Sequence, residues 1–463
     1  MQQNFRMVLI STYELGRQPF GLASPAAWLR QEGAEVRCLD LSQQHLEEEA
    51  IQAAELIAFY LPMHTATRIA VRVLKKVREL NPSVHLCAYG LYAPMNAELL
   101  RNLGVRTILG GEFEQGLLDL SRRLRARVEE ASEQSQVEPE ISLARQKFLV
   151  PDRTGLPSLK NYARLALPDG SERVVGYTEA SRGCKHLCRH CPIVPVYNGR
   201  FRIVQREVVL EDVRQQVAAG AQHITFGDPD FFNGIGHSLE LVQALHKEHP
   251  GVSYDVTIKV EHLLKHASHL PTLRDTGCAF VTTAAESLDD EVLAILDKGH
   301  SRADFFEVVR LLHEIGLGLT PTFVPFNPWT TLESYEDLLV NLAKLGLVEL
   351  VAPVQLSIRL LIPAGSRLLE LSEVRERIGE FDETALSYRW ANPDPRVDEL
   401  QREIEELVQF APAEICERKA TFEDMWRRLQ RALHEKMEFL KALPWGPPAQ
   451  SKPIPYLTEP WFC

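Results

Sequence analysis

Three cysteines stand close together near the middle of the chain: Cys184, Cys188 and Cys191. Their spacing, C-x3-C-x2-C, lets a single loop present three sulfur atoms to one metal centre. Thiolates are soft ligands that select zinc, copper(I) or iron–sulfur clusters. A four-iron cluster is usually held by four cysteines, so three cysteines leave one iron open to another ligand.

A zinc site is the main alternative for this loop. His186 or His190 can complete a set of three cysteines and one histidine, which is a known zinc arrangement. However, zinc sites usually come as two separated ligand pairs, and the sequence offers no second pair. A disulfide is disfavoured because the eight cysteines are spread thinly and the chain has a cytosolic character. The loop therefore favours an iron–sulfur cluster over zinc.

The loop resembles that of the radical S-adenosylmethionine (radical SAM) enzymes, whose motif is C-x3-C-x2-C. The resemblance implies a [4Fe-4S] cluster on Cys184, Cys188 and Cys191, with S-adenosylmethionine on the open iron. It also implies reductive cleavage of that molecule to a 5′-deoxyadenosyl radical. One position departs from the pattern: the family usually has an aromatic residue before the third cysteine, and this chain has His190.

The composition is ordinary for a soluble globular protein. A chain of 463 residues predicts roughly two or three domains. The net charge of −12 argues against a nucleic-acid-binding protein, which needs a basic face. No apolar run approaches the ~20 residues of a membrane span, and the N-terminus does not have the pattern of a signal peptide. We therefore expect a cytoplasmic protein with no nucleic acid or membrane partner.

The first part of the chain alternates strand-like and helix-like segments. The expected strands are residues 5–12, 36–41, 56–61, 85–89 and 107–109. This alternation predicts an α/β domain with a doubly wound parallel sheet, in which ligands bind beyond the carboxyl ends of the strands.

This region resembles the cobalamin-binding domain that precedes many radical SAM enzymes. The matching pieces are Pro19-Phe20-Gly21-Leu22, Trp28-Leu29-Arg30 with Gly33, and Gly110-Gly111-Glu112. The resemblance implies a cofactor contact at Thr12, Gly110 and Gly111. The Asp-x-His-x-x-Gly motif that supplies a histidine to cobalt is absent, and His64 stands alone in its loop. The alternative is a Rossmann-like domain that kept its shape without the ligand.

From residue 174 onward six apolar strand candidates are each followed by a helical stretch. They are residues 174–177, 223–226, 254–258, 280–284, 319–324 and 354–361. Ser301-x-x-Asp304 has the pattern of a capping box at a helix start. Repeated strand–helix units predict a barrel with its site at the carboxyl ends of the strands. The count matches the partial (β/α)6 barrel of the radical SAM family.

Two strand ends carry residues that the resemblance places at the cofactor. Gly227 and Asp228 follow the second strand, where the family has a Gly-Gly-Glu-like motif at the methionine amino group. Glu286 ends the fourth strand, where a polar residue often contacts the ribose or methionine part. Their alternatives are an Asp-Pro turn and a simple helix N-terminal carboxylate. No residue beyond the cluster is assigned a catalytic role.

We expect four regions: a Rossmann-like cobalamin-binding-type domain at 1–125, a linker at 126–150, a radical SAM partial barrel at 151–370, and a helical cap with a Pro-rich tail at 371–463. The tail resembles that of a radical SAM group ending in Cys-(Cys or selenocysteine)-Ala-Glu-Pro. Here the chain stops at Cys463. We hypothesise that a selenocysteine codon was read as a stop at this point.

The expected function is radical SAM chemistry, with cobalamin-dependent methyl transfer to an unactivated carbon. The alternatives are a cobalamin-free rearrangement or oxidoreduction and a non-catalytic iron–sulfur or cobalamin sensor. Methylthiolation is disfavoured because Cys38 and Cys87 do not form the second cluster set of that branch. The expected partners are a small-molecule or peptide substrate and an electron donor such as flavodoxin or ferredoxin.

Overall fold

The N-terminal domain is built on a parallel sheet with the strand order β2-β1-β3-β4-β5-β6. The computed structural model describes residues 5–129, 138–409, 415–433, 443 and 454–459. The strands are β1 (Arg6–Ser11), β2 (Glu35–Asp40), β3 (Leu56–Tyr60), β4 (His85–Tyr89), β5 (Thr107–Gly111) and β6 (Ile141–Ser142). The central strand β3 is fully buried, as expected for a parallel sheet covered on both faces.

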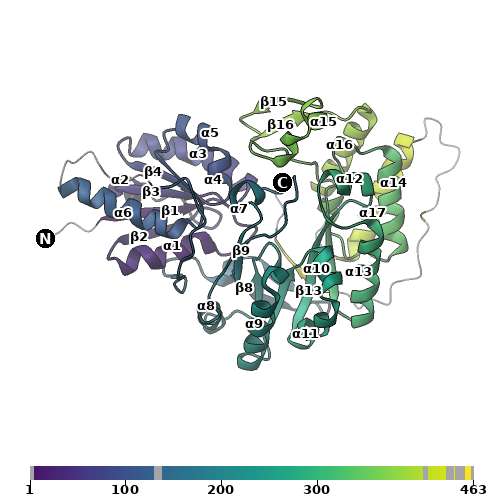
Figure 1. Ribbon diagram of the computed structural model, residues 1–463, viewed down its shortest axis with the longest axis horizontal. Coiled ribbons are helices and arrows are strands. Elements are labelled where there is room, and N and C mark those ends of the chain that lie inside the picture. The colour runs from purple at the N-terminus through teal and green to yellow at the C-terminus, as the bar shows by residue number, and fades with distance from the viewer. Residues whose placement is uncertain (1–4, 130–137, 410–414, 434–442, 444–453, 460–463) are drawn as a thin grey trace.

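Helices cover both faces of this sheet. They are α1 (Phe20–Gln31), α2 (Glu48–Ala53), α3 (His64–Leu80), α4 (Tyr92–Met95), α5 (Ala97–Asn102) and α6 (Phe113–Glu129). One apolar core lies between the sheet and helices α1 and α6, and the other lies between the sheet and α2–α5 (Figure 1). The predicted doubly wound domain is confirmed.

The second sheet is a curled half-barrel with the order β14-β13-β12-β11-β8-β7-β17. Five strands are parallel: β8 (Glu172–Thr178), β11 (His223–Phe226), β12 (Ser253–Thr257), β13 (Cys278–Glu286) and β14 (Gly318–Phe323). Two short antiparallel strands, β7 (Arg164–Ala166) and β17 (Tyr456–Leu457), extend its β8 edge.

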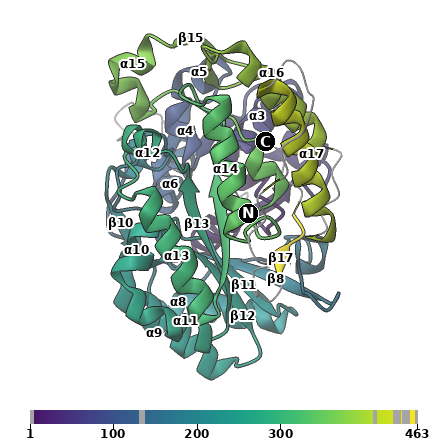
Figure 2. The ribbon, with the colours of Figure 1, turned by 90° about the vertical axis from the view of Figure 1, so that its right-hand side faces the viewer.

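Helices lie on the outer side of the half-barrel (Figure 2). They are α8 (Arg206–Ala218), α9 (Ile235–Glu248), α10 (Val260–Lys265), α11 (Leu270–Asp275), α12 (Asp290–Ile295), α13 (Arg302–Ile315) and α14 (Leu332–Lys344). The predicted capping box opens α13: Ser301 accepts a hydrogen bond from the Asp304 amide, and the Asp304 side chain accepts from the Ser301 amide. No helix in the described part of the chain is long and apolar enough to cross a bilayer.

The prediction of a sixth barrel strand at 354–361 is wrong. Pro353–Leu356 forms a 3-10 helix, and the segment meets β14's exit only through an isolated parallel bridge between Phe326 and Arg359. Proline lacks the amide hydrogen that a continuous ladder needs, and Pro353 starts this turn. The segment therefore stands at the sixth position of the barrel without forming a strand.

The remaining elements surround the open side of the half-barrel. They are β9 (Ser181–Gly183), α7 (Val194–Tyr197), β10 (Phe201–Ile203), α15 (Ser372–Arg375), the antiparallel pair β15 (Ile378–Asp382) and β16 (Ser387–Trp390), α16 (Pro395–Gln409) and α17 (Ile415–Leu433). The predicted helical cap corresponds to α16 and α17, whose apolar faces join the barrel core. Cys463 lies outside the described residues.

Two short strands tie distant parts of the chain together. β6, from the predicted linker, pairs with Gly110 and Gly111 at the edge of the first sheet. β17, from the predicted tail, pairs with Leu165 and Ala166 of β7. The division into four regions stays a prediction.

Gly21 is a position where the fold leaves no room for a side chain. A Cβ atom there would lie 2.2 Å from the ring of Tyr60, which packs on α1 from β3. We expect Gly21→Ala to lower the free energy of unfolding by about 1–3 kcal/mol in urea denaturation, because overpacking forces the ring or the helix to shift.

Gly236→Ala is the matched control, since Gly236 also lies in the first turn of a helix and its Cβ would meet no atom within 4 Å. Alanine there should be neutral or stabilising by up to about 1 kcal/mol. An unchanged stability of Gly21→Ala would contradict the packing of α1 against Tyr60.

Candidate functional site

The cysteine loop lies between β9 and α7, at the carboxyl end of the half-barrel. Gly183 enters it with a φ of 74°, and a Cβ there would lie 2.3 Å from the ring of Tyr197. The amide of Lys185 donates to Asn233 Oδ1 over 3.2 Å, and the amide of Arg189 donates to Leu296 O over 2.9 Å. The loop is therefore fixed by both the second and the fourth strand–helix units.

The three thiols form one electrostatic group. Cys188 is buried, while Cys184 and Cys191 are half-buried. Burial, together with the neighbouring sulfurs of Cys188 and Cys184, raises the pKa of Cys191 to about 12. Burial also raises the pKa of Cys184. Without a cation the neutral forms of Cys184 and Cys191 are favoured, whereas a metal centre deprotonates coordinating thiols outright. Three soft sulfur donors on one rigid loop fit a cluster with one open iron.

A second group of metal-binding side chains shares one of these cysteines. Ligand atoms of Cys184, His186 and Asp230 lie within 4.8 Å of one another. Burial would raise the pKa of Asp230, but hydrogen bonds from His186 and His262 outweigh it and lower the pKa to about 2. His262 Nδ1 is 2.6 Å from Asp230. The zinc alternative thus gains a Cys–His–Asp set that differs from the predicted one.

Glu286, predicted at the cofactor, lies at the end of β13 next to the cysteine loop. Its carboxylate is 3.1 Å from His190 Nε2 and 3.3 Å from Lys298 Nζ. Burial would raise the pKa of Glu286, yet the Lys298 charge and the His190 hydrogen bond lower it to about 2. His190, which replaces the family's aromatic residue, is therefore held by β13. Lys298 was not predicted, because a single lysine after a short helix carries no pattern.

We expect Glu286→Gln to lower the free energy of unfolding by about 3–5 kcal/mol, because it leaves the buried Lys298 ammonium without its carboxylate. Chemical denaturation measures this. Glu291→Gln, at an exposed position on α12, is the control and should change stability by less than about 0.5 kcal/mol. Equal stabilities of the two variants would contradict a buried ion pair at Glu286.

Gly227 and Asp228 follow β11, as predicted, and touch the entry to the cysteine loop. Asp228 accepts hydrogen bonds from Ser181 Oγ at 2.5 Å and from the Ala180 amide at 2.9 Å. Burial raises the pKa of Asp228 to about 7. A Cβ at Gly227 would lie 1.8 Å from the Tyr177 hydroxyl. Asp228 holds the start of β9 in place, whereas Gly227 lies against β8. The contact of either residue with a cofactor stays a prediction.

The predicted cobalamin residues are engaged within the N-terminal domain. Thr12 Oγ1 donates to Ala66 O over 2.7 Å. A Cβ at Gly110 would lie 2.3 Å from Pro94 Cγ, and one at Gly111 would lie 2.2 Å from the Ser142 oxygen. Gly110 and Gly111 allow Pro94 and Ser142 of the same chain to pack closely against the end of β5. The contacts of these glycines with a cofactor stay predictions.

His64, the histidine at the carboxyl edge of this sheet, is also engaged. Its Nε2 lies 2.6 Å from Ala385 O, in the turn between β15 and β16. Burial lowers the pKa of His64. Because its Nε2 atom contacts Ala385 O, the His64 imidazole is not free to bind a cobalt ion through that atom. His64 is therefore not positioned as a ligand to cobalt in this arrangement.

Arg182, two residues before the first cysteine, joins the two domains. Its guanidinium is 2.7 Å from Glu114 and 3.5 Å from Glu112 of the N-terminal domain, and 2.6 Å from Glu179. It also lies over the rings of Phe20, Phe113 and Phe148. All four charged side chains are largely buried, so the loop is anchored to the first domain. No local sequence pattern indicates this network, although Glu112 belongs to the Gly110-Gly111-Glu112 segment.

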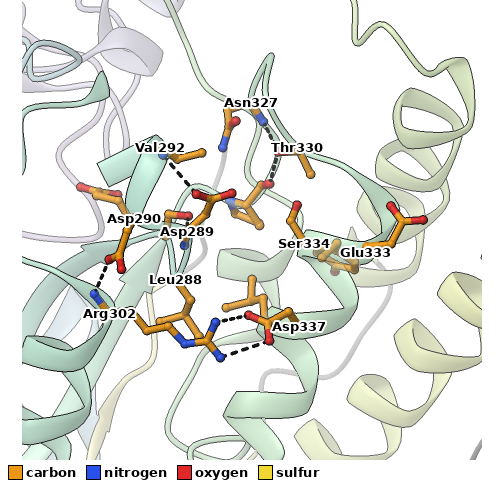
Figure 3. A pocket seen from close by; sticks show the side chains of 15 residues that line it. Leu288, Asp289, Asp290, Val292, Arg302, Asn327, Thr330, Glu333, Ser334 and Asp337 are labelled. Atoms are coloured by element: carbon orange, nitrogen blue, oxygen red, sulfur yellow. Dashed lines mark hydrogen bonds and ion pairs between the residues drawn. The ribbon is translucent and has the colours of Figure 1, made fainter. Parts of the chain in front are cut away.

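A polar pocket of about 370 Å³ lies at the ends of β13 and β14, beside Glu286 (Figure 3). Arg302 pairs with Asp337 at 2.7 Å, and its amide donates to Asp290. Asp289 caps α12 through the Glu291 and Val292 amides. In Figure 3, Arg302 of α13 is joined to Asp290 of α12 and to Asp337 of α14, which ties these three helices together.

Residues 178–339 match the radical SAM superfamily. This chain contains a radical SAM domain. The matched segment begins at the end of β8, includes the cysteine loop and ends within α14. The predicted superfamily is confirmed. The three cysteines lie within the matched segment.

Curated relatives match only in part. The chain is 25% identical over 181 residues to a tRNA-2-methylthio-N(6)-dimethylallyladenosine synthase of Geobacter sulfurreducens, covering 36% of this chain and 39% of that protein. It is 23% identical over 151 residues to the hopanoid C-3 methylase of Methylococcus capsulatus, covering 33% and 29%. The chain thus spans less than two fifths of the length of these relatives.

Solved structures match over most of the chain. The cobalamin-dependent S-adenosylmethionine radical enzyme OxsB has a TM-score of 0.64 at 13% identity, over 93% of this chain and 72% of OxsB. The radical S-adenosylmethionine methyltransferase TsrM of Kitasatospora setae has a TM-score of 0.62 at 16% identity, over 95% and 92%. At these identities the likeness shows the fold, and it confirms the predicted α/β architecture.

Proposed function

We propose that this protein is a radical SAM methyltransferase acting on an unactivated carbon. The observation that carries the proposal is the three-cysteine loop at the carboxyl end of a half-barrel that follows a Rossmann-like domain. The likeness of the fold to OxsB and TsrM over most of the chain supports the proposal. We further propose a cytoplasmic location and an electron donor such as flavodoxin or ferredoxin.

In this proposal Cys184, Cys188 and Cys191 hold the [4Fe-4S] cluster. When bound, the cluster supplies the electron that cleaves S-adenosylmethionine to a 5′-deoxyadenosyl radical. The backbone of Gly227 and Asp228 binds the methionine amino group, since a cation needs oxygen acceptors. Glu286 orients His190 and would contact the ribose or methionine part of S-adenosylmethionine. Burial of these groups keeps water away from the radical.

Cobalamin between the two domains remains part of the proposal, supported by the likeness to OxsB and TsrM. The contact between His64 and Ala385 stands against a histidine ligand to cobalt. The absorption spectrum of protein purified in the presence of cobalamin tests binding: a bound corrinoid supports it, and protein without one points to a cobalamin-free radical reaction.

Methylthiolation is a second candidate, because relatives with that activity match the chain. It needs a second cluster, and Cys38 and Cys87 are the cysteines of the N-terminal domain. Both are buried, on β2 and β4, with β1 and β3 between them. Burial raises the pKa of Cys38 to about 11. These two thiols form no ligand set, so methylthiolation is disfavoured.

The test is product analysis with anaerobically reconstituted protein, S-adenosylmethionine and dithionite. We expect 5′-deoxyadenosine, and S-adenosylhomocysteine when the substrate is methylated. Formation of 5′-deoxyadenosine without S-adenosylhomocysteine in the presence of turned-over substrate would indicate a rearrangement or oxidoreduction instead. The absence of both products would favour a non-catalytic sensor.

A further inference from the structure

A cavity of about 970 Å³ lies on the inner face of the half-barrel. At one end it reaches Ile193, just after the cysteine loop, and Asp228. The parallel strands form one wall, and segments from the C-terminal part of the chain form the other. Its volume is in the upper range for small-molecule sites. The residues of its two walls indicate which class of ligand the cavity can bind.

The strand wall is rich in hydroxyl groups. Thr257, Thr282 and Thr320 are register partners on the adjacent strands β12, β13 and β14, and Thr322 lies one step further along β14. All four side chains are half-buried and line the cavity. No hydrogen bond joins their hydroxyl groups to another residue in the described part of the chain. This wall therefore offers uncommitted donors and acceptors.

The opposite wall is mainly apolar. Ile454, Tyr456 and Leu457 of the C-terminal strand line it together with Val354 and Val408. A ligand that fills the cavity meets hydroxyl groups on one side and apolar side chains on the other. The cavity is therefore suited to an amphipathic molecule.

Arg418 provides the charge that distinguishes this cavity. It lies on α17, is only 7% exposed and lines the cavity. Its Nη1 donates to Glu349 O over 2.8 Å, its guanidinium lies 5.2 Å from the Tyr456 ring, and its Nε has no partner. Among the residues that the structure describes, no carboxylate forms an ion pair with it. A buried cation of this kind is unfavourable until an anion pairs with it.

Two acidic residues of the cavity are engaged elsewhere. Asp255 accepts from His223 at 2.9 Å and from Thr225 at 2.6 Å. Glu405 accepts from Gln401 at 2.9 Å. Arg17 and Glu459 also line the cavity, and Arg17 Nε and Glu459 Oε2 have no hydrogen-bond partner. Arg418 is the more deeply buried of the two lining arginines.

We propose that the cavity binds an amphipathic carboxylate, whose carboxylate group pairs with Arg418 and whose body lies between the threonine wall and the apolar wall. A single buried guanidinium matches one carboxylate in charge and geometry. The identification of this ligand as the substrate rests on the proposed function, whereas the binding site itself does not. Tyr456 is a positioning residue, because it holds the guanidinium from the C-terminal strand.

The test compares two probes of the same shape, indole-3-acetate and its neutral amide, indole-3-acetamide. Calorimetric titration uses the full-length protein with its reconstituted metal centre. We expect the acid to bind at least about tenfold more tightly than the amide, since a charge-assisted bidentate pair is worth more than a neutral hydrogen bond. Equal affinities, or no binding of either probe, would overturn the proposal.

Variants locate the effect. Arg418→Gln should remove the preference for the acid and leave the affinity of the amide unchanged, while Arg418→Lys should retain part of the preference. Arg427→Gln is the control on the exposed face of the same helix and should preserve it. Loss of the preference in the Arg427 variant, or its persistence in both Arg418 variants, would overturn the proposal.

The same samples are assayed for 5′-deoxyadenosine, so the two claims fail separately. A preference for the acid without 5′-deoxyadenosine would refute the radical SAM function and leave the anion site standing. Production of 5′-deoxyadenosine with equal affinities would refute the anion site alone.

Discussion

Replacing Arg182 with methionine is expected to lower the free energy of unfolding by about 3–5 kcal/mol, the cost of leaving a buried charge without its partner. The substitution keeps an unbranched side chain but leaves Glu112, Glu114 and Glu179 as buried carboxylates around an apolar group. Burial raises the pKa of Glu112 to about 7 even with Arg182 in place. Because the guanidinium bridges both domains, we also expect the cysteine loop to lose its anchor.

Chemical denaturation of the variant, with intrinsic fluorescence as the readout, measures this effect. Arg214→Met is the matched control: Arg214 pairs with Glu248 and Glu211 at the surface, where ion pairs contribute about 0–1 kcal/mol. A stability of Arg182→Met within about 1 kcal/mol of the wild type would contradict the interdomain network.

Replacing Cys191 with alanine is expected to abolish cluster assembly and with it the cleavage of S-adenosylmethionine. Loss of an outer-shell partner of a metal ligand already costs about 10–100-fold. Removal of one of three ligands should exceed that, so 5′-deoxyadenosine should fall to background. Liquid chromatography of quenched anaerobic reactions measures it.

His186→Ala separates the cluster from the zinc alternative. His186 belongs to the Cys184–His186–Asp230 group, whereas Cys191 does not. The cluster interpretation predicts that the histidine variant keeps its iron and the cysteine variant loses it. If the histidine variant lost its metal while Cys191→Ala retained it, the cysteine loop would be a zinc site.

Local patterns in the sequence predicted much of this structure. The alternation of strand-like and helix-like segments predicted both sheets, because the apolar runs of parallel strands must be covered by helices on both faces. Ser301 and Asp304 predicted a helix start correctly, since a capping box depends only on residues three apart. The cysteine spacing placed the loop correctly for the same reason.

The features that were missed depend on residues far apart in the chain. Arg182 meets Glu114 across 68 residues, and Arg418 meets Tyr456 through a short strand in a Pro-rich tail. The apolar run 354–361 resembled a strand, but Pro353 starts a turn and only Arg359 completes a bridge. Contacts of this kind arise from tertiary packing, which local periodicity does not encode.

The most direct test of the central claim is the iron, acid-labile sulfide and zinc content of the anaerobically reconstituted wild-type protein. We expect about four irons and four sulfides per chain, as a [4Fe-4S] cluster on Cys184, Cys188 and Cys191 requires. About one zinc per chain without sulfide would contradict it and assign the loop to a zinc site.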